Sequence, residues 1–232
     1  MSLGKREFII PQLSGAVCRT RQKLELEEWF SPGFSAKNNT QDKSYQLSKL
    51  YAEAARCRLC HIADTKTKLV FGEGSEDAKL VFVGEAPGRE EDLTGKPFVG
   101  PAGKLLTRII EAMGFKRSEV YITNALRCRP PQNRNPDQEE IANCRSALVA
   151  LLNIIRPQVI CALGKFAAWS LTGQQKPISK LRGHTFNFGN AKIIATFHPA
   201  YLLRNPQDKK LVWQDMLKIK DILKNNESCE IH

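Results

Sequence analysis

Four of the seven cysteines are spaced as metal ligands commonly are. Cys57 and Cys60 form a C-x2-C pair, and Cys128 and Cys144 form a second, wider pair. Two such pairs can close a tetrahedral site of four thiolates, which zinc and a [4Fe–4S] cluster both use. The spacing therefore predicts a metal site with a structural role, and on its own it leaves zinc and iron–sulfur open.

Polar residues follow short apolar runs at four places along the chain. The first run ends in Gly84-Glu85-Ala86, and the second ends in Thr123-Asn124. The third leads into Gly164-Lys165, and the fourth leads into Phe197-His198-Pro199. Glycine allows close approach of a backbone, while Glu, Asn and His supply hydrogen-bonding groups. These four turns are the segments that could carry chemistry.

The runs and the segments between them predict the elements that hold these turns. Apolar runs predict strands at 80–83, 120–122, 159–163 and 193–196, and residues 185–189 predict a hairpin. Helical spacing predicts helices at 45–56, 102–113, 136–155, 165–171 and 209–224. Alternating strands and helices indicate parallel β-α units, and continuous apolar runs are typical of strands covered on both faces. Ligands bind at the carboxyl ends of such strands, so one cleft can contain all four turns.

Charge favours a polyanionic partner. The chain has a formal net charge of +11. Residues 1–50 hold eight basic and five acidic side chains, so +8 (11 − 3) belongs to the remainder. Lys and Arg release counterions from phosphates, which suits nucleic acid, although charge alone also fits simple solubility.

Composition indicates a soluble globular protein, with 42% apolar and 25% charged residues. The sequence has no apolar run of transmembrane length and no secretory signal, so we expect a cytoplasmic location and no membrane partner. The odd number of cysteines argues against a disulfide scaffold. We interpret residues 1–47 as a polar, flexible extension, 48–224 as the folded domain and 225–232 as a polar tail.

Three long segments together resemble a known family. They are the run from Gly84 to Leu106, the run from Ile122 to Pro131 and the run from His198 to Arg204. Taken together they resemble the family 4 uracil-DNA glycosylases, the iron–sulfur members of the uracil-DNA glycosylase superfamily, over residues 48–223. The resemblance implies an α/β fold of three α/β/α layers with a central four-stranded parallel sheet. It also implies a [4Fe–4S] cluster rather than zinc on Cys57, Cys60, Cys128 and Cys144.

The resemblance implies roles for the residues of the turns. Phe98 would stack on a flipped uracil, and Asn124 would read its O4 and N3 edge. The backbone around Glu85 and Ala86 would meet O2, and His198 would donate a hydrogen bond to O2 as the base leaves. These roles make chemical sense, since Asn offers the donor and acceptor that uracil requires, whereas cytosine presents the opposite pattern.

The group that handles the attacking water is the open question of this site. Some other branches of the superfamily carry Asp or Asn where this chain has Ala86, whose side chain can neither act as a base nor orient water. Glu85 is the first candidate and Glu91 the second. A dissociative reaction needs only electrostatic help for the sugar cation, so a strong base is not required.

The expected partner is uracil-containing DNA, single- or double-stranded. Either Leu202 or Leu203 would enter the stack that the flipped base leaves. Helix starts suit phosphate groups. The expected DNA-contacting residues are therefore Gly103, Lys104, Lys165, Tyr201, Leu202, Leu203 and Arg204.

The implied activity is hydrolysis of the N-glycosidic bond of deoxyuridine by a monomeric enzyme, which leaves an abasic site. One alternative is a relative that traps the sugar covalently on a histidine, but residues 129–137, where that histidine would lie, contain none. A second alternative is a non-catalytic iron–sulfur protein that binds DNA or transfers electrons.

Overall fold

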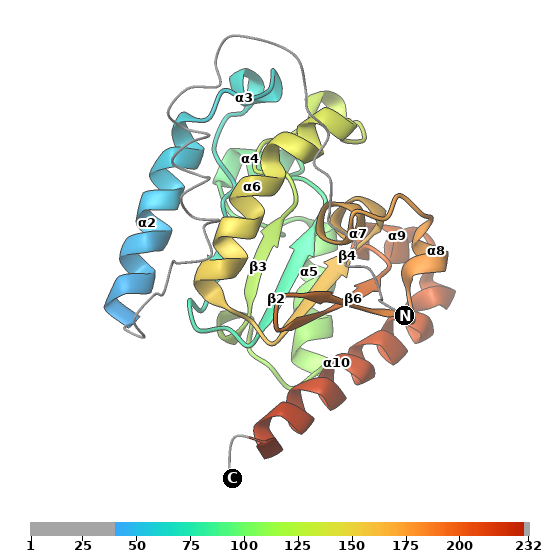
Figure 1. Cartoon of the computed structure of the whole chain (residues 1–232). Coiled ribbons are helices and arrows are strands. Elements are labelled where there is room, and N and C mark those ends of the chain that lie inside the picture. The colour runs from blue at the N-terminus through green and yellow to red at the C-terminus, as the bar shows by residue number, and fades with distance from the viewer. Residues whose placement is uncertain (1–39, 230–232) are drawn as a thin grey trace, which may run out of the picture. The chain divides into compact units, whose positions relative to one another are not determined.

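The computed structural model describes residues 40–229, with side chains described for 43–226. Six strands form one sheet in the order β1-β3-β2-β4-β6-β5 (Figure 1). They are β1 (Glu73–Gly74), β2 (Leu80–Gly84), β3 (Tyr121–Asn124), β4 (Val159–Leu163), β5 (Thr185–Phe188) and β6 (Ala191–Thr196). The four central strands are parallel and both edge strands are antiparallel. The parallel four-stranded centre is therefore confirmed, and the sheet has an additional strand at each edge.

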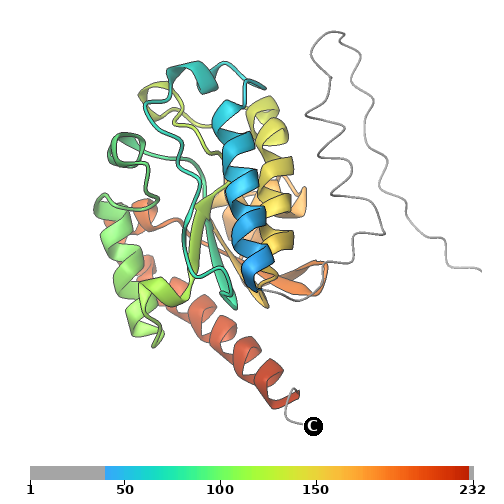
Figure 2. The same ribbon diagram turned by 90° about the vertical axis from the view of Figure 1, so that its left-hand side faces the viewer.

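Helices cover both faces of the sheet, which confirms the three-layer α/β/α architecture (Figure 2). One face carries α5 (Pro101–Ala112), α9 (Pro199–Arg204) and α10 (Lys209–Cys229). The other carries α2 (Thr40–Arg56), α6 (Gln138–Ile155) and α7 (Lys165–Thr172). The short helices are α3 (Ile62–Thr65), α4 (Arg89–Thr94), α8 (Ile178–Leu181), η1 (Arg117–Glu119), η2 (Pro131–Asn133) and η3 (Pro206–Asp208).

The core forms because the central strands are apolar on both sides. Alternate strand residues such as Phe82, Cys161 and Ile194 pack against apolar residues of α5, α9 and α10. Their neighbours along the strands, including Val81 and Ile160, are also fully buried and point to the opposite face. Cys161 thus acts as a small core residue.

The boundaries of the folded unit differ from those expected. Helix α2 begins at Thr40 and buries Leu47 and Leu50, so packing begins before residue 48. Helix α10 continues to Cys229 through part of the expected tail. Residues 1–39 of the expected extension and 230–232 lie outside the described residues. Within the described part of the chain, no helix combines the length and apolarity needed to cross a membrane.

Candidate active site

The four turns lie side by side at the carboxyl ends of the central strands, because these strands are parallel neighbours. This end of the sheet is called the carboxyl edge below, or simply the edge, and it differs from the lateral edges formed by β1 and β5. Gly84 and Asn124 are register partners at the ends of β2 and β3. At the ends of β4 and β6, the Gly164 N–H donates to the Thr196 carbonyl at 2.8 Å. Two further bonds join the first two turns, since the amides of Ala125 and Leu126 donate to the carbonyls of Gly84 and Glu85. Backbone hydrogen bonds therefore fix the spacing of the turns in pairs.

Asn124 and Phe98 meet over the backbone of Gly84. A methyl group at Gly84 would lie 2.3 Å from Asn124 Oδ1 and 2.5 Å from Phe98 Cζ. The Phe98 ring also stacks on His198, with 5.6 Å between centroids and 30° between planes. Asn124 is 2% exposed and Phe98 7%. The structure thus brings together Asn124 and His198, from two of the four turns, and Phe98, from the loop between β2 and α5.

The loop that carries Phe98 is held by Glu91. One oxygen of its carboxylate accepts from the amides of Val99 (2.9 Å) and Gly100 (3.0 Å), and the other accepts from the amide of Gly88 (3.1 Å). Both oxygens accept hydrogen bonds from main-chain donors, and the expected role of Glu91 toward the attacking water stays a prediction. Its place in the structure is that of a loop brace.

Phe98 has a left-handed backbone conformation, with φ +53°. The start of α5 packs directly on it. A methyl group at Gly103 would lie 1.9 Å from the Phe98 carbonyl oxygen. Gly103 is therefore required for the approach of α5 to this loop, and its expected DNA contact stays a prediction.

His198 is held as a neutral hydrogen-bond donor. Its Nδ1 accepts from the Ala200 amide at 3.1 Å, so the proton of the neutral ring lies on Nε2. Burial lowers the pKa of His198 to about 4; Glu91 opposes this shift, and the charge of Arg204 adds to it. A neutral imidazole whose proton lies on Nε2 can donate a hydrogen bond to negative charge that develops on a leaving group.

Glu85 occupies the same edge in a partly buried position. Burial raises its pKa to about 7, and the charge of Lys165 opposes the shift. The Lys165 ammonium lies 4.5 Å from the centroid of the Phe166 ring and 5.6 Å from that of Trp169. Glu85 therefore changes charge near neutral pH, as a group that accepts a proton from water must be able to do.

The expected DNA-contacting leucines have different environments. Leu202 is 1% exposed and belongs to the core beneath α9, so its expected insertion into DNA is wrong. Leu203 is 46% exposed. The Tyr201 ring stacks on Phe197, and its hydroxyl donates to Asp208 at 2.7 Å. Leu203, together with exposed Lys104 and Arg204, remains free to meet DNA.

The expected metal ligands come from three segments: Cys57 and Cys60 follow α2, Cys128 follows β3, and Cys144 lies in α6. Cys60, Cys128 and Cys144 pack in one cluster that also contacts Ala86 of the first turn. Burial raises the pKa of Cys128 to about 12, and the thiols of Cys144, Cys60 and Cys57 each raise it further. Among the described residues, no group of three or more His, Cys, Asp or Glu side chains lies close enough to hold a single metal ion.

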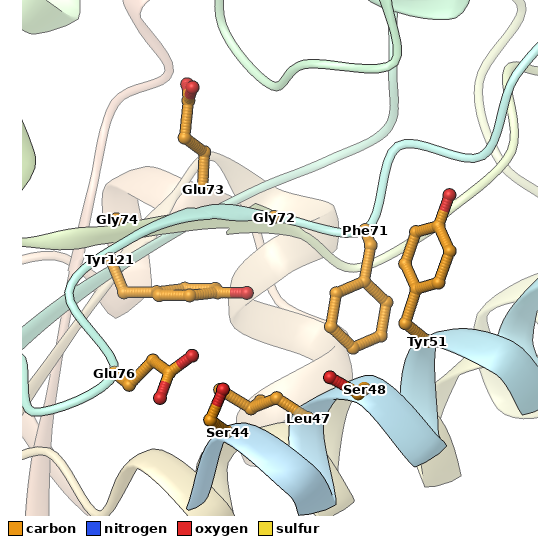
Figure 3. Close-up of a pocket in the computed structure, with 10 residues that line it drawn as sticks. All are labelled: Ser44, Leu47, Ser48, Tyr51, Phe71, Gly72, Glu73, Gly74, Glu76 and Tyr121. Carbon is orange, nitrogen blue, oxygen red and sulfur yellow. The ribbon is translucent and has the colours of Figure 1, made fainter.

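Two pockets lie away from this edge. One of about 300 Å³ lies between α2 and β1 (Figure 3) and is lined by residues that include Tyr51, Phe71 and Tyr121. A second of about 550 Å³ lies on the other side of Phe71 and is lined by Lys66, Lys68 and Lys96 among others. Neither is lined by Asn124, Phe98 or His198. The candidate site is therefore defined by its converging side chains.

Comparison with known proteins links this geometry to one family. The model of the uracil DNA glycosylase superfamily matches residues 71–217. A type-4 uracil-DNA glycosylase of Thermotoga maritima is 44% identical over 184 residues, 77% of this chain and 96% of that protein. The type-4 enzyme of Archaeoglobus fulgidus is 45% identical over 76% of this chain and 92% of its own length. That of Saccharolobus solfataricus is 41% identical over 76% and 86%, respectively.

Proposed function

The chain belongs to the uracil DNA glycosylase superfamily, and we infer from its type-4 relatives that it is a uracil-DNA glycosylase. It hydrolyses the N-glycosidic bond of deoxyuridine and leaves an abasic site, as base excision repair requires. The observation that carries this inference beyond the family is the convergence of Asn124, Phe98 and His198 beside Gly84.

We propose that Asn124 selects the base. Enzymes that act on a base in DNA extrude it into a pocket and read its Watson–Crick edge. The Asn124 amide offers an acceptor for N3–H and a donor for O4 of uracil. Cytosine would present an acceptor and a donor in the reverse order, which would leave buried polar groups unpaired. Phe98 supplies a ring on which the base stacks.

His198 would assist departure of the base. As the glycosidic bond breaks, negative charge grows on uracil O2. The Nε2–H of His198 can donate to that oxygen, and its neutrality is supported by burial and by the Ala200 amide on Nδ1. A preorganised donor of this kind is worth about 3–4 kcal/mol.

Glu85 would orient the water that captures the sugar. Ala86 has no polar side chain, and both oxygens of Glu91 are engaged by the loop. Glu85 remains, and as a carboxylate it would also stabilise the cationic sugar. The bond breaks through an oxocarbenium-like state, so electrostatic help suffices without a strong base.

Cys57, Cys60, Cys128 and Cys144 would hold a [4Fe–4S] cluster. The fit is supported by the packing of three of these residues together and by the influence of all four thiols on one another. A polynuclear cluster joins each thiolate to a different iron atom, so its ligands need not converge on one point as they do around zinc. When bound, it would supply a structural link between α2, the turn after β3 and α6.

We propose that the substrate is uracil in single- or double-stranded DNA and that the enzyme acts as a monomer in the cytoplasm, with the chromosomal DNA. The net charge of +11 supports a polyanionic partner. Leu203 would fill the gap left by the flipped base, and Lys104, Lys165, Tyr201 and Arg204 would lie near the DNA backbone. Exposure of Leu203 supports its part in this proposal.

The proposal is tested with purified protein and an oligonucleotide that contains one uracil. Free uracil and an alkali-labile abasic site are expected, with the DNA released from the protein on a denaturing gel. A persistent protein–DNA adduct would show the covalently trapping alternative. Binding without any abasic product would show the non-catalytic one.

A further inference from the structure

Arg127 is a buried cation that forms no ion pair with a carboxylate among residues 43–226. The residue is 2% exposed and lies between Asn124 and Cys128 in the turn after β3. Its Nη1 donates to Thr123 Oγ1 at 2.8 Å and to the Asn124 carbonyl oxygen. Its Nε and Nη2 are buried without a hydrogen-bond partner in the described part of the chain. One guanidinium therefore has two unused donors in a dry environment.

Such an arrangement is costly without a counter-charge. Burying a guanidinium is strongly unfavourable unless it is paired and hydrogen-bonded. The phenyl ring of Phe71, 5.4 Å from the Arg127 guanidinium carbon, offers only a weak partner. By contrast, Arg182 lies on the other side of the fold and donates to both carboxylate oxygens of Asp215 at 3.2 Å. Among the described residues, Arg127 has no carboxylate partner like the Asp215 that pairs with Arg182.

Cys144 and Cys128, two of the proposed cluster ligands, lie close enough to Arg127 for their charges to act on it. Burial raises the pKa of Cys144, while a hydrogen bond from the Arg127 backbone and the Arg127 charge lower it. Cys128 is the next residue along the chain. A cluster bound by four thiolates carries net negative charge, and its sulfur atoms accept N–H hydrogen bonds.

We propose that Arg127 is a positioning residue that pairs with the bound cluster through its free donors and holds the Asn124 carbonyl through Nη1. This inference rests on the proposed [4Fe–4S] cluster and gives the cluster a role in positioning Asn124. The cluster neutralises the buried guanidinium, and the guanidinium fixes the backbone of the residue that reads uracil. Asn124 and the cysteines are thereby joined by one side chain.

The test compares wild type with Arg127→Met, Arg127→Lys and Arg182→Met. Arg127→Met retains most of the volume and removes the charge, so it should shift the reduction potential of the cluster to more negative values. It should also speed iron loss to a chelator by about 10- to 100-fold, the usual effect of removing a partner of metal ligands. Arg127→Lys should restore most of the potential. Arg182→Met removes a partly buried guanidinium elsewhere and should leave the potential at the wild-type value.

A second readout concerns Asn124. Arg127→Met should lower kcat/KM for uracil excision, and Arg127→Lys should restore kcat/KM only in part. Lysine lacks the planar guanidinium that can donate to the Asn124 carbonyl and to the cluster at the same time. If Arg127→Met does not fold, Arg127→Lys carries the test, because its ammonium cannot donate to the Asn124 carbonyl and to the cluster together. Its iron loss should then be faster than that of wild type, and an equal rate would overturn the pairing. Wild-type protein without iron would overturn the cofactor proposal and the pairing with it. A loaded wild type whose potential and iron loss match those of Arg127→Met would overturn the pairing alone.

Discussion

His198 and Glu85 show how burial, as the largest influence on both pKa values, can prepare two side chains for different tasks. Removal from water disfavours the charged form of each, so the pKa of His198 falls to about 4 and that of Glu85 rises to about 7. At neutral pH the histidine is therefore a neutral donor, while the glutamate is divided between its two forms. A donor for the leaving base and an ionisable group for water thus arise at one edge of the sheet.

The raised pKa of Glu85 predicts the pH dependence of the reaction. Single-turnover excision should rise with pH through about pH 7, as the carboxylate form is populated. Glu85→Gln should be slower by about 10²-fold above that pH, and its profile should lack the rise through pH 7. An unchanged pH profile in Glu85→Gln would assign the water to another group.

Thermal melting supplies the control for Glu85→Gln. Because the folded-state pKa lies above the usual value of 4.5, ionisation of Glu85 destabilises the folded protein as pH rises from 4.5 to 7. The glutamine variant should therefore melt no lower than wild type above pH 7. A loss of rate in that range cannot then be attributed to unfolding.

Sequence patterns located most of these residues but not their partners. Asn124 and His198 could be predicted as strand-end residues because an apolar run stops beside each. The sequence of an acidic stretch does not indicate which carboxylate accepts hydrogen bonds from main-chain amides. The roles of Glu91 and Glu85 could therefore not be told apart from sequence. Leu202 and Leu203 are neighbours on the short helix α9, and only packing decides which one is buried.

At the scale of elements, the site depends on the close approach of a strand end, a loop and a helix start. The end of β2 has no side chain at Gly84, and this allows Asn124 and Phe98 to meet there. Glu91 closes the loop before α5, and Gly103 admits the backbone of Phe98 to the first turn of that helix. At Gly103 the close contact is with the backbone of Phe98, which side-chain movement cannot relieve, whereas at Gly84 it is with the side chains of Asn124 and Phe98.

Gly84→Ala should therefore abolish base recognition more than it affects folding. The added methyl displaces the Asn124 amide and the Phe98 ring, and a misplacement of about 1 Å costs about 10²-fold in rate. Gly114→Ala is the matched control, because its methyl would meet no atom within 4 Å although its φ of +89° strains the backbone. The control should lose stability and retain kcat/KM. Equal activity of the two variants would contradict the assigned geometry.

Leu203 should matter where a base pair has to be opened. Leu203→Ala is expected to reduce excision from a U·A duplex about tenfold, equivalent to ~1.4 kcal/mol, and to leave excision from single strands near wild type. Leu217→Ala on α10 is the matched control, since Leu217 is 43% exposed and Leu203 46%. Equal losses on both substrates, or a similar loss in the control, would remove Leu203 from the DNA-opening step.

The central strands could be predicted because each is a continuous buried run of apolar residues. The edge strands could not be predicted so well. Strand β1 has only two residues, and the residues of β5 alternate between exposed and half-buried. Their positions follow from hydrogen bonding to β3 and β6, which local sequence does not reveal.

At the scale of the whole molecule, positive charge should govern affinity for DNA. The logarithm of the binding constant should fall linearly with the logarithm of salt concentration, with a slope of about −0.9 per phosphate neutralised on duplex DNA. Lys104→Ala should reduce that slope by about one. Lys192 lies at the start of β6, at the amino ends of the parallel strands and so opposite the carboxyl edge. Lys192→Ala should leave the salt slope unchanged. A similar slope change in both variants would mean that the charge acts without a defined interface.

Folding also brings the cysteines together with the base-reading residue. The end of α2, the turn after β3 and the body of α6 are distant in sequence, and they meet around Cys128. The spacing of the cysteines could predict a four-thiolate site, but it could not predict that a buried arginine lies between that site and Asn124. The proposed cluster would be part of the scaffold that holds the Asn124 turn.

The central claim is that this edge excises uracil, and a cleavage assay on U·G and U·A duplexes tests it most directly. Wild type should convert both to abasic product. Asn124→Asp and His198→Ala should each be slower by about 10²–10³-fold while retaining wild-type secondary structure, because each removes a preorganised donor. If both folded variants cleave as fast as wild type, the uracil site lies elsewhere and this account is wrong.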